Sequence, residues 1–411
     1  MRFHLLSFEG CDPYAQAGGI ASRVTGLAET LATLGFETHL WFIGDPDLPG
    51  HEQRGDLHLH RWCQWISRFH PGGVYDGEEG KRADYVHSLP PHLASRIIPE
   101  LAEGGTAVVL AEEWQTADAV LHLDWLLRQA DVRDRVRLFW NANNTFGFDR
   151  VDWKRLAGAA RITTVSRYMK HLMWRLGVDP LVIPNGLPPD AFEWPDPTAV
   201  VEMRQAVGDR PVLAKVARWD PDKRWILTID IVGQLKRQGL EPLLVARGGV
   251  EAHGHEVMAR AAARGLRVAE RVIDDPGPRG LLAVLAKAGD ADVISLRTPI
   301  DADARRVLYS GASTVLANSG HEPFGLVALE AMAVGGLACT GCSGEDYVVA
   351  GRNALVMQTA TVGEFVRLFG WLREHAAEEA ALRRAGRQTA EQFAWGEVVE
   401  RNLLPAIDIS G

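Results

Sequence analysis

Short apolar runs alternate along the chain with segments of helical periodicity. The runs in the first half, rich in Val, Leu, Ile, Phe and Trp, predict strands over Arg2–Phe8, Thr38–Ile43, Ala107–Ala111, Arg137–Asn141 and Arg161–Val165. Between the first two runs, apolar residues recur at helical spacing, at Val24, Leu27, Leu31 and Leu34. Strands that alternate with helices in this way are typical of a parallel sheet covered by helices.

The second half of the chain repeats this scheme. Its apolar runs predict strands over Val212–Val216, Leu243–Ala246, Val293–Leu296, Thr314–Ala317 and Leu337–Cys339. Between the halves, residues 179–197 carry six prolines, which fix φ and remove backbone donors, so this stretch is predicted to be a linker. A length of 411 residues also favours two domains, with a boundary near Asn185 and Gly186. Two such domains predict a ligand cleft between them.

Charge and composition exclude several classes of protein. The formal net charge of −9 argues against a nucleic-acid-binding protein, which would carry a basic domain. The first ten residues lack the long apolar segment of a secretory signal, and no run of about 18 apolar residues occurs, so we expect a cytoplasmic protein. Cys339 and Cys342 have the spacing of a redox pair, but they follow an apolar helix, and a tight bend is the favoured interpretation.

The most informative stretch is residues 313–336, where a predicted strand leads through a polar loop into a helix beginning near Pro323 or Phe324. The free N–H groups and partial positive charge of a helix N-terminus suit a phosphate. Glu330 lies in this helix among apolar neighbours, and a buried carboxylate needs a partner. Two partners stay open: a sugar diol such as a ribose, or an arginine in a structural ion pair.

Together, Glu322 and Glu330 in the sequence EPFGLVALEAMA resemble the Glu-x7-Glu motif of retaining glycosyltransferases related to glycogen synthase and sucrose synthase (glycosyltransferase family 4). The segment from Arg218 to Lys223 is similar to the G-R-x-x-P-x-K-G loop of this family, with Arg224 in place of the last glycine. Further similar segments are Gly18–Ile20, residues 112–116, Thr164–Ser166, Ile183–Gly186 and Phe393–Trp395. The resemblance therefore covers nearly the whole chain.

The resemblance implies a GT-B fold, in which two doubly wound Rossmann-like α/β domains face each other across a cleft. Residues 1–185 are then the acceptor-side domain, joined by a crossing helix over residues 389–411, and residues 186–388 are the donor-side domain. The resemblance further implies a retaining, metal-independent transfer of a hexose-type sugar from a nucleotide-diphosphate sugar. No further cofactor is expected.

In the second domain, the resemblance assigns a role to each of four polar residues. Arg218 and Lys223 neutralise the diphosphate leaving group, which is the electrostatic help that sugar transfer needs without a metal. Glu322 contacts the donor sugar, and Glu330 binds the ribose hydroxyls. The other donor-binding positions are Gly18 and Gly19 of the first domain and Phe324, Gly325 and Leu326 of the second.

In the first domain, the chain departs from the family pattern. Many relatives carry a histidine after the strand over Arg137–Asn141, where this chain has Asn143 or Asn144. We predict Asn143 as the catalytic-site residue, although asparagine binds a sugar hydroxyl without transferring a proton. Two other functions therefore stay open: a nucleotide-sugar epimerase on the same fold, and a non-catalytic nucleotide-sugar-binding protein.

The sequence predicts no metal site and does not identify the acceptor. His58 and His60 alternate on a possible strand, but no spacing typical of metal ligands appears. Residues 61–85 mix aromatic and basic side chains that suit a sugar or a phosphorylated acceptor, and they are equally typical of a surface loop. Tyr168–Arg175 is either a core-facing helix or a peripheral contact with an anionic membrane. The expected partners are a nucleotide-sugar donor and an unidentified acceptor, without nucleic acid.

Overall fold

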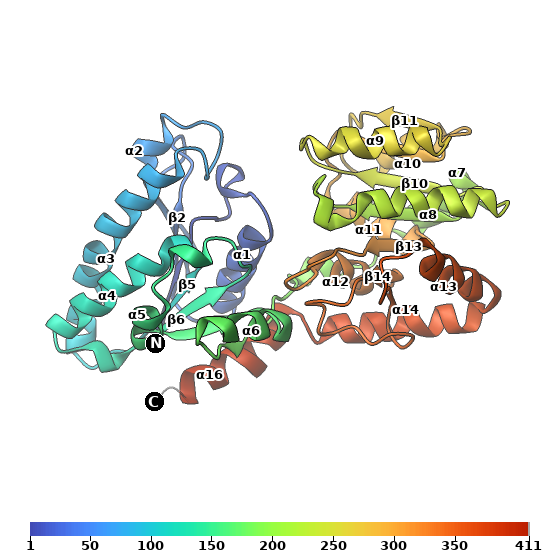
Figure 1. Ribbon diagram of the computed structural model, residues 1–411. Coiled ribbons are helices and arrows are strands. Elements are labelled where there is room, and N and C mark those ends of the chain that lie inside the picture. The colour runs from blue at the N-terminus through green and yellow to red at the C-terminus, as the bar shows by residue number, and fades with distance from the viewer. Residues whose placement is uncertain (410–411) are drawn as a thin grey trace. The chain divides into compact units, whose positions relative to one another are not determined.

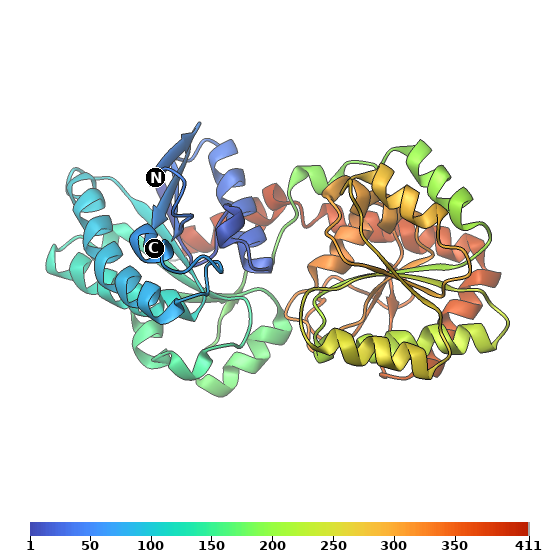
Figure 2. The same ribbon diagram turned by 90° about the horizontal axis from the view of Figure 1, so that it is seen from above.

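The computed structural model describes residues 1–409, which form two compact α/β units (Figure 1). Unit 1 comprises residues 1–188 and the chain from Phe393 onward, and unit 2 comprises residues 189–392. Each unit contains a largely parallel sheet with helices on both faces, most clearly visible for unit 2 in Figure 2. The predicted fold class of two doubly wound α/β units is confirmed.

The sheet of unit 1 has the strand order β3-β4-β2-β1-β5-β6-β7-β8, and β3 runs antiparallel to β4. Its strands are β1 (Arg2–Leu6), β2 (Thr38–Ile43), β3 (His51–Arg54), β4 (Leu57–Trp62), β5 (Ala107–Glu112), β6 (Val136–Ala142), β7 (Arg161–Thr164) and β8 (Leu181–Val182). Its helices are α1 (Gly19–Thr33), α2 (Gln64–Ser67), α3 (Glu78–Ala102), α4 (Ala117–Gln129), α5 (Trp153–Ala159), α6 (Arg167–Met173), α15 (Trp395–Val398) and α16 (Leu404–Ile409). The predicted strands of this half are confirmed with ends shifted by at most two residues.

Alternation along the strands of unit 1 divides their side chains between two layers of helices. Phe3, Leu5 and Leu40 face a buried cluster with α1 and the C-terminal helices, in which Trp395 is fully buried. The intervening residues of β1, β2 and β4 face the opposite layer, which contains α3. The end of the chain is therefore part of the core of unit 1.

The sheet of unit 2 is parallel, with the strand order β11-β12-β10-β9-β13-β14-β15. Its strands are β9 (Val212–Val216), β10 (Leu243–Arg247), β11 (Val268–Arg271), β12 (Val293–Leu296), β13 (Thr314–Ala317), β14 (Ala338–Thr340) and β15 (Leu355–Val356). Its helices are α7 (Pro197–Val207), α8 (Trp225–Arg237), α9 (His253–Ala263), α10 (Pro278–Ala286), α11 (Ala302–Gly311), α12 (Leu326–Ala333), α13 (Val362–Glu374) and α14 (Ala376–Glu391). The predicted strands of this half agree to within one residue.

One local prediction is wrong. Helix α12 begins at Leu326 and not at Pro323 or Phe324, because Gly325 adopts a left-handed φ of 91° just before it. Residues 61–85 contain the end of β4, all of α2 and the start of α3, and only Cys63 and residues 68–77 within this stretch lie outside helices and strands. Lys81 within it is fully buried, and its Nζ donates to Tyr14 Oη at 2.6 Å.

The basic segment Tyr168–Arg175 forms most of α6 and the turn that follows it. This helix buries Met169 and Met173 in unit 1, which agrees with the core-facing interpretation, while Trp174 is exposed. None of the helices within residues 1–409 combines the length and the apolarity needed to cross a membrane.

Candidate functional site

Three neighbouring parallel strands of unit 2, β9, β13 and β14, end at the same edge of the sheet. The loops that follow them are residues 217–224, 318–325 and 341–347, and we call these three loops the carboxyl edge of unit 2. Ligands of open parallel sheets bind at such an edge. The edge gathers the predicted residues Arg218, Lys223, Glu322, Phe324 and Gly325 next to the first residue of α12, Leu326.

Lys223 and Glu322 form an ion pair at this edge. Lys223 Nζ donates to Glu322 Oε2 at 2.7 Å, and the side chains are 23% and 19% exposed, so solvent or a ligand reaches both. Arg218 is exposed and forms no ion pair with any residue of the described chain. A cation in the same loop as Lys223, together with the lysine–carboxylate pair, suits a ligand that carries both anionic oxygens and hydroxyl groups.

Asp222, which the sequence analysis did not single out, connects the first two loops. Its carboxylate accepts from the His321 N–H at 3.1 Å, and its carbonyl accepts from the Gly320 N–H at 2.7 Å. Arg224, at the position where the family has glycine, adopts a left-handed φ of 52°. That conformation costs a non-glycine residue roughly 1–2 kcal/mol, so the loop holds Arg224 there against its local preference.

Glu345 of the third loop was also missed by sequence reasoning. It is buried, its Oε2 accepts from the Ser343 N–H at 3.1 Å, and its Oε1 has no partner within the described chain. Burial raises the pKa of this carboxyl to about 7, so its charge changes near neutral pH. A Cβ on Gly325 would lie 2.7 Å from Glu345 Cγ, so the loop packs here against a glycine. The sequence signal was an acidic residue soon after a predicted strand.

Lys215 lies within the apolar strand β9, below the carboxyl edge. It is 1% exposed, and its Nζ donates to Asn318 Oδ1 at 2.7 Å and to the Leu316 carbonyl at 3.1 Å. Burial lowers the pKa of this ammonium group to about 7. A lysine inside an otherwise apolar strand was a visible signal, and its side chain links β9 to β13 and to the loop that carries Glu322.

Glu330 has the arginine partner that the sequence left open. Arg305 Nε of α11 lies 3.6 Å from Glu330 Oε2. Burial raises the pKa of Glu330, whereas the charge of Arg305 opposes this shift. The Glu330 side chain is nevertheless 27% exposed, so a ligand can also reach it. The ion pair and a ribose contact are therefore compatible.

In unit 1, the N-terminus of α1 carries Gly18 and Gly19, but its N–H groups already bind a carboxylate. Glu9 Oε2 accepts from the N–H groups of Gly18 and Ala21, both at 3.0 Å. Tyr75 Oη donates to the other oxygen of Glu9 at 2.6 Å. A phosphate at this position would be repelled by the negative charge of Glu9. The role of Gly18 and Gly19 as phosphate contacts therefore stays a prediction, and this geometry does not favour it.

Asn143 follows β6 and belongs to a buried polar network in unit 1. Its Nδ2 donates to Glu112 Oε2 at 2.7 Å, and Arg23 Nε donates to Glu112 Oε1 at 3.0 Å. Asn143 Oδ1 is buried without a partner within the described chain and is free to accept from a ligand hydroxyl. Asn144, the other candidate, accepts from the Phe146 N–H in a local turn. Of the two asparagines, Asn143 is therefore the one whose side-chain oxygen is available to a ligand.

Glu113 lies at the carboxyl end of β5, beside Asn143, and was not predicted as a site residue. It is buried, takes a left-handed φ of 67°, and accepts from the Asn143 N–H at 2.7 Å. Burial raises the pKa of its carboxyl to about 8. Residues with a left-handed φ are concentrated at functional sites, and so are buried carboxyl groups with a raised pKa.

The pH dependence of stability tests this reading of Glu113. Because its folded pKa of about 8 exceeds the ordinary 4.5, the folded protein keeps a proton that the unfolded chain releases between these values. Its contribution to the free energy of unfolding is full below about pH 4.5 and is lost as the pH rises towards 8. Glu113→Gln keeps a neutral acceptor, so we expect a flatter dependence of the urea midpoint on pH. The exposed Glu103→Gln is the control, and equal slopes in all three proteins would contradict the prediction.

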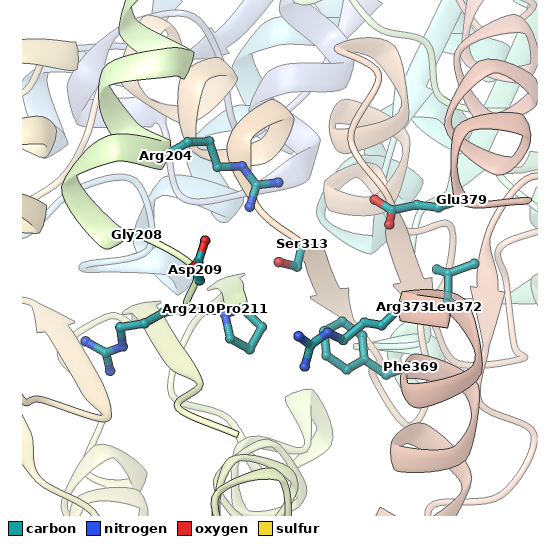
Figure 3. Close-up of a pocket in the computed structure, with 10 residues that line it drawn as sticks. All are labelled: Arg204, Gly208, Asp209, Arg210, Pro211, Ser313, Phe369, Leu372, Arg373 and Glu379. Atoms are coloured by element: carbon teal, nitrogen blue, oxygen red, sulfur yellow. The ribbon is translucent and has the colours of Figure 1, made fainter. Parts of the chain in front are cut away.

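A pocket of about 340 Å³ lies elsewhere in unit 2 (Figure 3). It is lined by Arg204, Arg210 and Ser313, among others. Pro211 and Ser313 directly precede β9 and β13, so the pocket opens at the amino ends of these strands. It therefore lies at the opposite edge of the sheet from Arg218, Lys223 and Glu322.

The cysteines of the chain are free thiols. Burial raises the pKa of Cys339 to about 12, so its thiolate is not formed at neutral pH. Cys339 lies in β14 and Cys342 in the bend that follows it, as the tight-bend interpretation expects.

Comparisons with known proteins agree with this architecture. Residues 17–191 match the model of Glycosyltransferase Family 4. Over 120 residues, the chain is 32% identical to a D-inositol 3-phosphate glycosyltransferase of Streptomyces avermitilis; the match spans 29% of this chain and only 26% of that relative. The catalytic domain of starch synthase IV from Arabidopsis thaliana, bound to ADP and acarbose, has 15% identity and a TM-score of 0.70 over 100% of this chain and 99% of that one. HepE of Anabaena in complex with UDP has 16% identity and a TM-score of 0.64 over 100% of both chains.

These matches agree with the resemblance to glycosyltransferases that the sequence carries. The family match covers the larger part of unit 1, and the likeness to solved glycosyltransferases covers both units. At 15% and 16% identity the two solved structures establish the GT-B fold alone. The donor, the acceptor and the stereochemistry have to be argued from the residues of this chain.

Proposed function

Starting from a GT-B chain whose residues 17–191 match glycosyltransferase family 4, we propose a retaining glycosyltransferase that moves a hexose-type sugar from a nucleoside-diphosphate sugar to an acceptor hydroxyl. The observation that carries this proposal is the Lys223–Glu322 pair at 2.7 Å, beside the exposed Arg218 and the N-terminus of α12. We propose that these cations bind a diphosphate and that the carboxylate binds sugar hydroxyls. The ADP and UDP bound by the two structural neighbours support a nucleotide ligand of this class.

The proposed chemistry follows from the charges at this edge. The bond between the anomeric carbon and the diphosphate oxygen breaks, and negative charge develops on the diphosphate. Arg218, Lys223 and the first N–H groups of α12 stabilise that charge. The described residues of this edge thus provide the electrostatic help, and we propose that transfer needs no metal.

Retention is proposed to follow a front-face path. The acceptor oxygen attacks the face from which the diphosphate leaves, and the departing phosphate oxygen takes the acceptor proton. Such a path needs no histidine at the Asn143 position. The Asn143 Oδ1, which is buried without a partner in the described chain, is proposed to orient a sugar hydroxyl. Glu322 is proposed to orient the donor sugar through its carboxylate.

The test is a screen of the full chain against nucleotide sugars, first for a shift of the melting temperature and then for turnover with a panel of acceptors. Mass spectrometry and the anomeric configuration of the product identify the reaction, in the presence and absence of a chelator. Retained configuration and turnover in chelator are expected. Donor binding without any sugar transfer would favour a non-catalytic protein, and inversion of a ring carbon in the donor alone would favour an epimerase.

The ribose contact proposed for Glu330 predicts a measurable loss of nucleotide affinity. Glu330→Ala should weaken binding of the nucleoside diphosphate that the screen identifies by about 1.5–3 kcal/mol, the value of hydrogen bonds to a charged group. Wild type and variant should bind the same diphosphate with a 2′,3′-dideoxyribose equally tightly. Isothermal titration calorimetry measures both.

Arg305→Ala is the matched control, because it removes the other half of the ion pair and keeps the carboxylate. If both variants lost stability but bound the nucleotide as tightly as wild type, Glu330 would serve only the ion pair with Arg305.

A further inference from the structure

A row of histidines crosses the sheet of unit 1 at its β3 edge. Strand pairing places His4 opposite His39 and His39 opposite His58, on three neighbouring strands. His60 lies one pair further along β4, opposite His51 of β3. Period-two alternation puts all of them on the face opposite to the apolar cluster of Phe3, Leu5 and Leu40.

The rings of this row are joined by nitrogen contacts as well as by stacking. His39 Nδ1 lies 3.0 Å from His60 Nε2, and His58 Nδ1 lies 3.3 Å from His51 Nε2. The two Nδ1 atoms are therefore occupied by neighbouring imidazoles. Any aromatic side chain could stack in this row, whereas the nitrogen–nitrogen contacts require histidine. The remaining Nε2 of His39 lies 3.2 Å from Glu37 Oε1.

Glu37, His39 and His58 each offer a ligand atom, and the three atoms lie within 4.8 Å of one another. In a tetrahedral zinc site with bonds of about 2.0–2.2 Å, donor atoms sit roughly 3.3–3.5 Å apart. Glu37 and His58 are only partly buried, so a small rotation of their side chains brings the three donor atoms to the separations of a zinc site. We propose that these three residues bind a divalent transition-metal ion, with Zn²⁺ as the ion that the ligand set suits.

The surroundings of the three ligands resemble those that metal sites require. A histidine ligand is usually held through its second ring nitrogen, which fixes the tautomer; His60 does this for His39, and His51 does it for His58. Arg2 Nε donates to Glu37 Oε2 at 2.7 Å, which leaves Oε1 directed to His39. Imidazole nitrogen with one carboxylate suits Zn²⁺, Co²⁺ and Ni²⁺ more than Mg²⁺ or Ca²⁺.

One further observation supports a ligand on this face. His4, stacked on His39, is 3% exposed, and its Nε2 has no partner within the described chain. A buried polar atom without a partner is costly, and a bound ion with its water molecules supplies partners to such a face.

The site lies away from the proposed transfer chemistry. His39 and His58 are the second residues of β2 and β4, at the amino ends of these strands, whereas Glu9, Glu113 and Asn143 follow strands at their carboxyl ends. The ion therefore joins β4 to β2 and stabilises the edge of unit 1. Its presence is independent of the proposed sugar transfer. The sequence analysis predicted no metal because the ligands come from separate segments and meet only through strand register.

The experiment uses the full chain, freed of metal with a chelator and dialysed, and titrates it with Zn²⁺ alone by isothermal titration calorimetry. Wild type should bind one ion, and Zn²⁺ should raise its melting temperature. Co²⁺ should give the absorption bands of a low-coordinate site. The partly exposed ligands are changed in His58→Gln and Glu37→Gln, each of which should weaken Zn²⁺ binding at least tenfold.

His171→Gln is the matched control, because His171 is exposed on α6 of the same unit and away from the row. It should bind Zn²⁺ as wild type does, and circular dichroism checks that each variant is folded. The proposal is overturned if wild type shows no saturable binding. It is also overturned if folded His58→Gln and Glu37→Gln both bind Zn²⁺ with unchanged affinity.

Discussion

Lys223→Ala is expected to lower sugar turnover by about 100- to 1,000-fold, the usual effect of removing one group that stabilises charge in a transition state. Lys223 Nζ is 2.7 Å from Glu322 Oε2, so the substitution removes a cation from the proposed diphosphate site and also leaves Glu322 without this partner. Affinity for a nucleoside diphosphate should fall more than tenfold, whereas affinity for the bare nucleoside should stay unchanged. Calorimetry with both ligands and a turnover assay measure these effects.

Lys236→Ala is a close control for this prediction. Lys236 also forms a 2.7 Å ion pair, with Asp292, but it lies at the C-terminal end of α8, and Asp292 precedes β12 at the amino edge of the sheet. The control removes one lysine–carboxylate pair from the same unit and should leave turnover within about twofold of wild type. Equal losses of affinity for the diphosphate and for the nucleoside would show that Lys223 does not contact the diphosphate.

Glu322→Gln should lower turnover while nucleoside diphosphate binding persists.

Trp395→Ala should destabilise unit 1 by about 3–5 kcal/mol, as expected for a large aromatic side chain removed from a core. Trp395 is 1% exposed and packs in the cluster that contains α1. A Cβ on Gly26 would lie 2.3 Å from its Nε1, and one on Gly186 would lie 2.5 Å from its Cδ2. The ring therefore fills a space that two glycines leave open, and the rest of the cluster cannot close it.

Hydrogen exchange of unit 1 peptides and the urea midpoint measure this loss. Trp125→Ala is the control in the same unit, because Trp125 is 55% exposed on α4 and should change stability by less than about 1 kcal/mol. Gly26→Ala should act in the same direction as Trp395→Ala, since the added methyl group meets the ring. Similar losses for Trp395→Ala and Trp125→Ala would contradict the packing role of the chain end.

Local sequence was sufficient to predict most strands and the position in the fold of the proposed donor-site residues. Val212–Val216, Val293–Leu296 and Thr314–Ala317 are largely apolar runs, and the structure has strands with these bounds. Burial of a parallel strand on both faces makes most of its residues apolar, so such strands can be recognised from the sequence. The strands β3, β8, β11 and β15 were not predicted. Strand β3 is largely exposed, no residue of β11 is fully buried, and β8 and β15 have only two residues each.

The carboxyl edge of unit 2 was predicted in part. A residue that follows a parallel strand must lie at that edge, so Arg218, Lys223 and Glu322 were placed by chain order alone. Their partners were not: the Lys223–Glu322 bond joins residues 99 positions apart, and Glu345 reaches the edge through a third loop. Contacts of this kind depend on side-chain direction after the loops are packed.

The sequence by itself determined the two α/β halves through periodicity, and the loops that carry the proposed donor chemistry through chain order. The charge of Glu330 among apolar neighbours also limited its partner to an arginine or a sugar diol. Only the tertiary structure decided that Arg305 is the partner of Glu330, that Glu9 occupies the N-terminus of α1, and that His39 and His58 lie side by side with Glu37. The physical reason is the same in each case. Hydrogen bonds and ion pairs between distant segments require strand register and helix packing to bring their atoms within about 3–4 Å, and no local pattern in the chain encodes that distance.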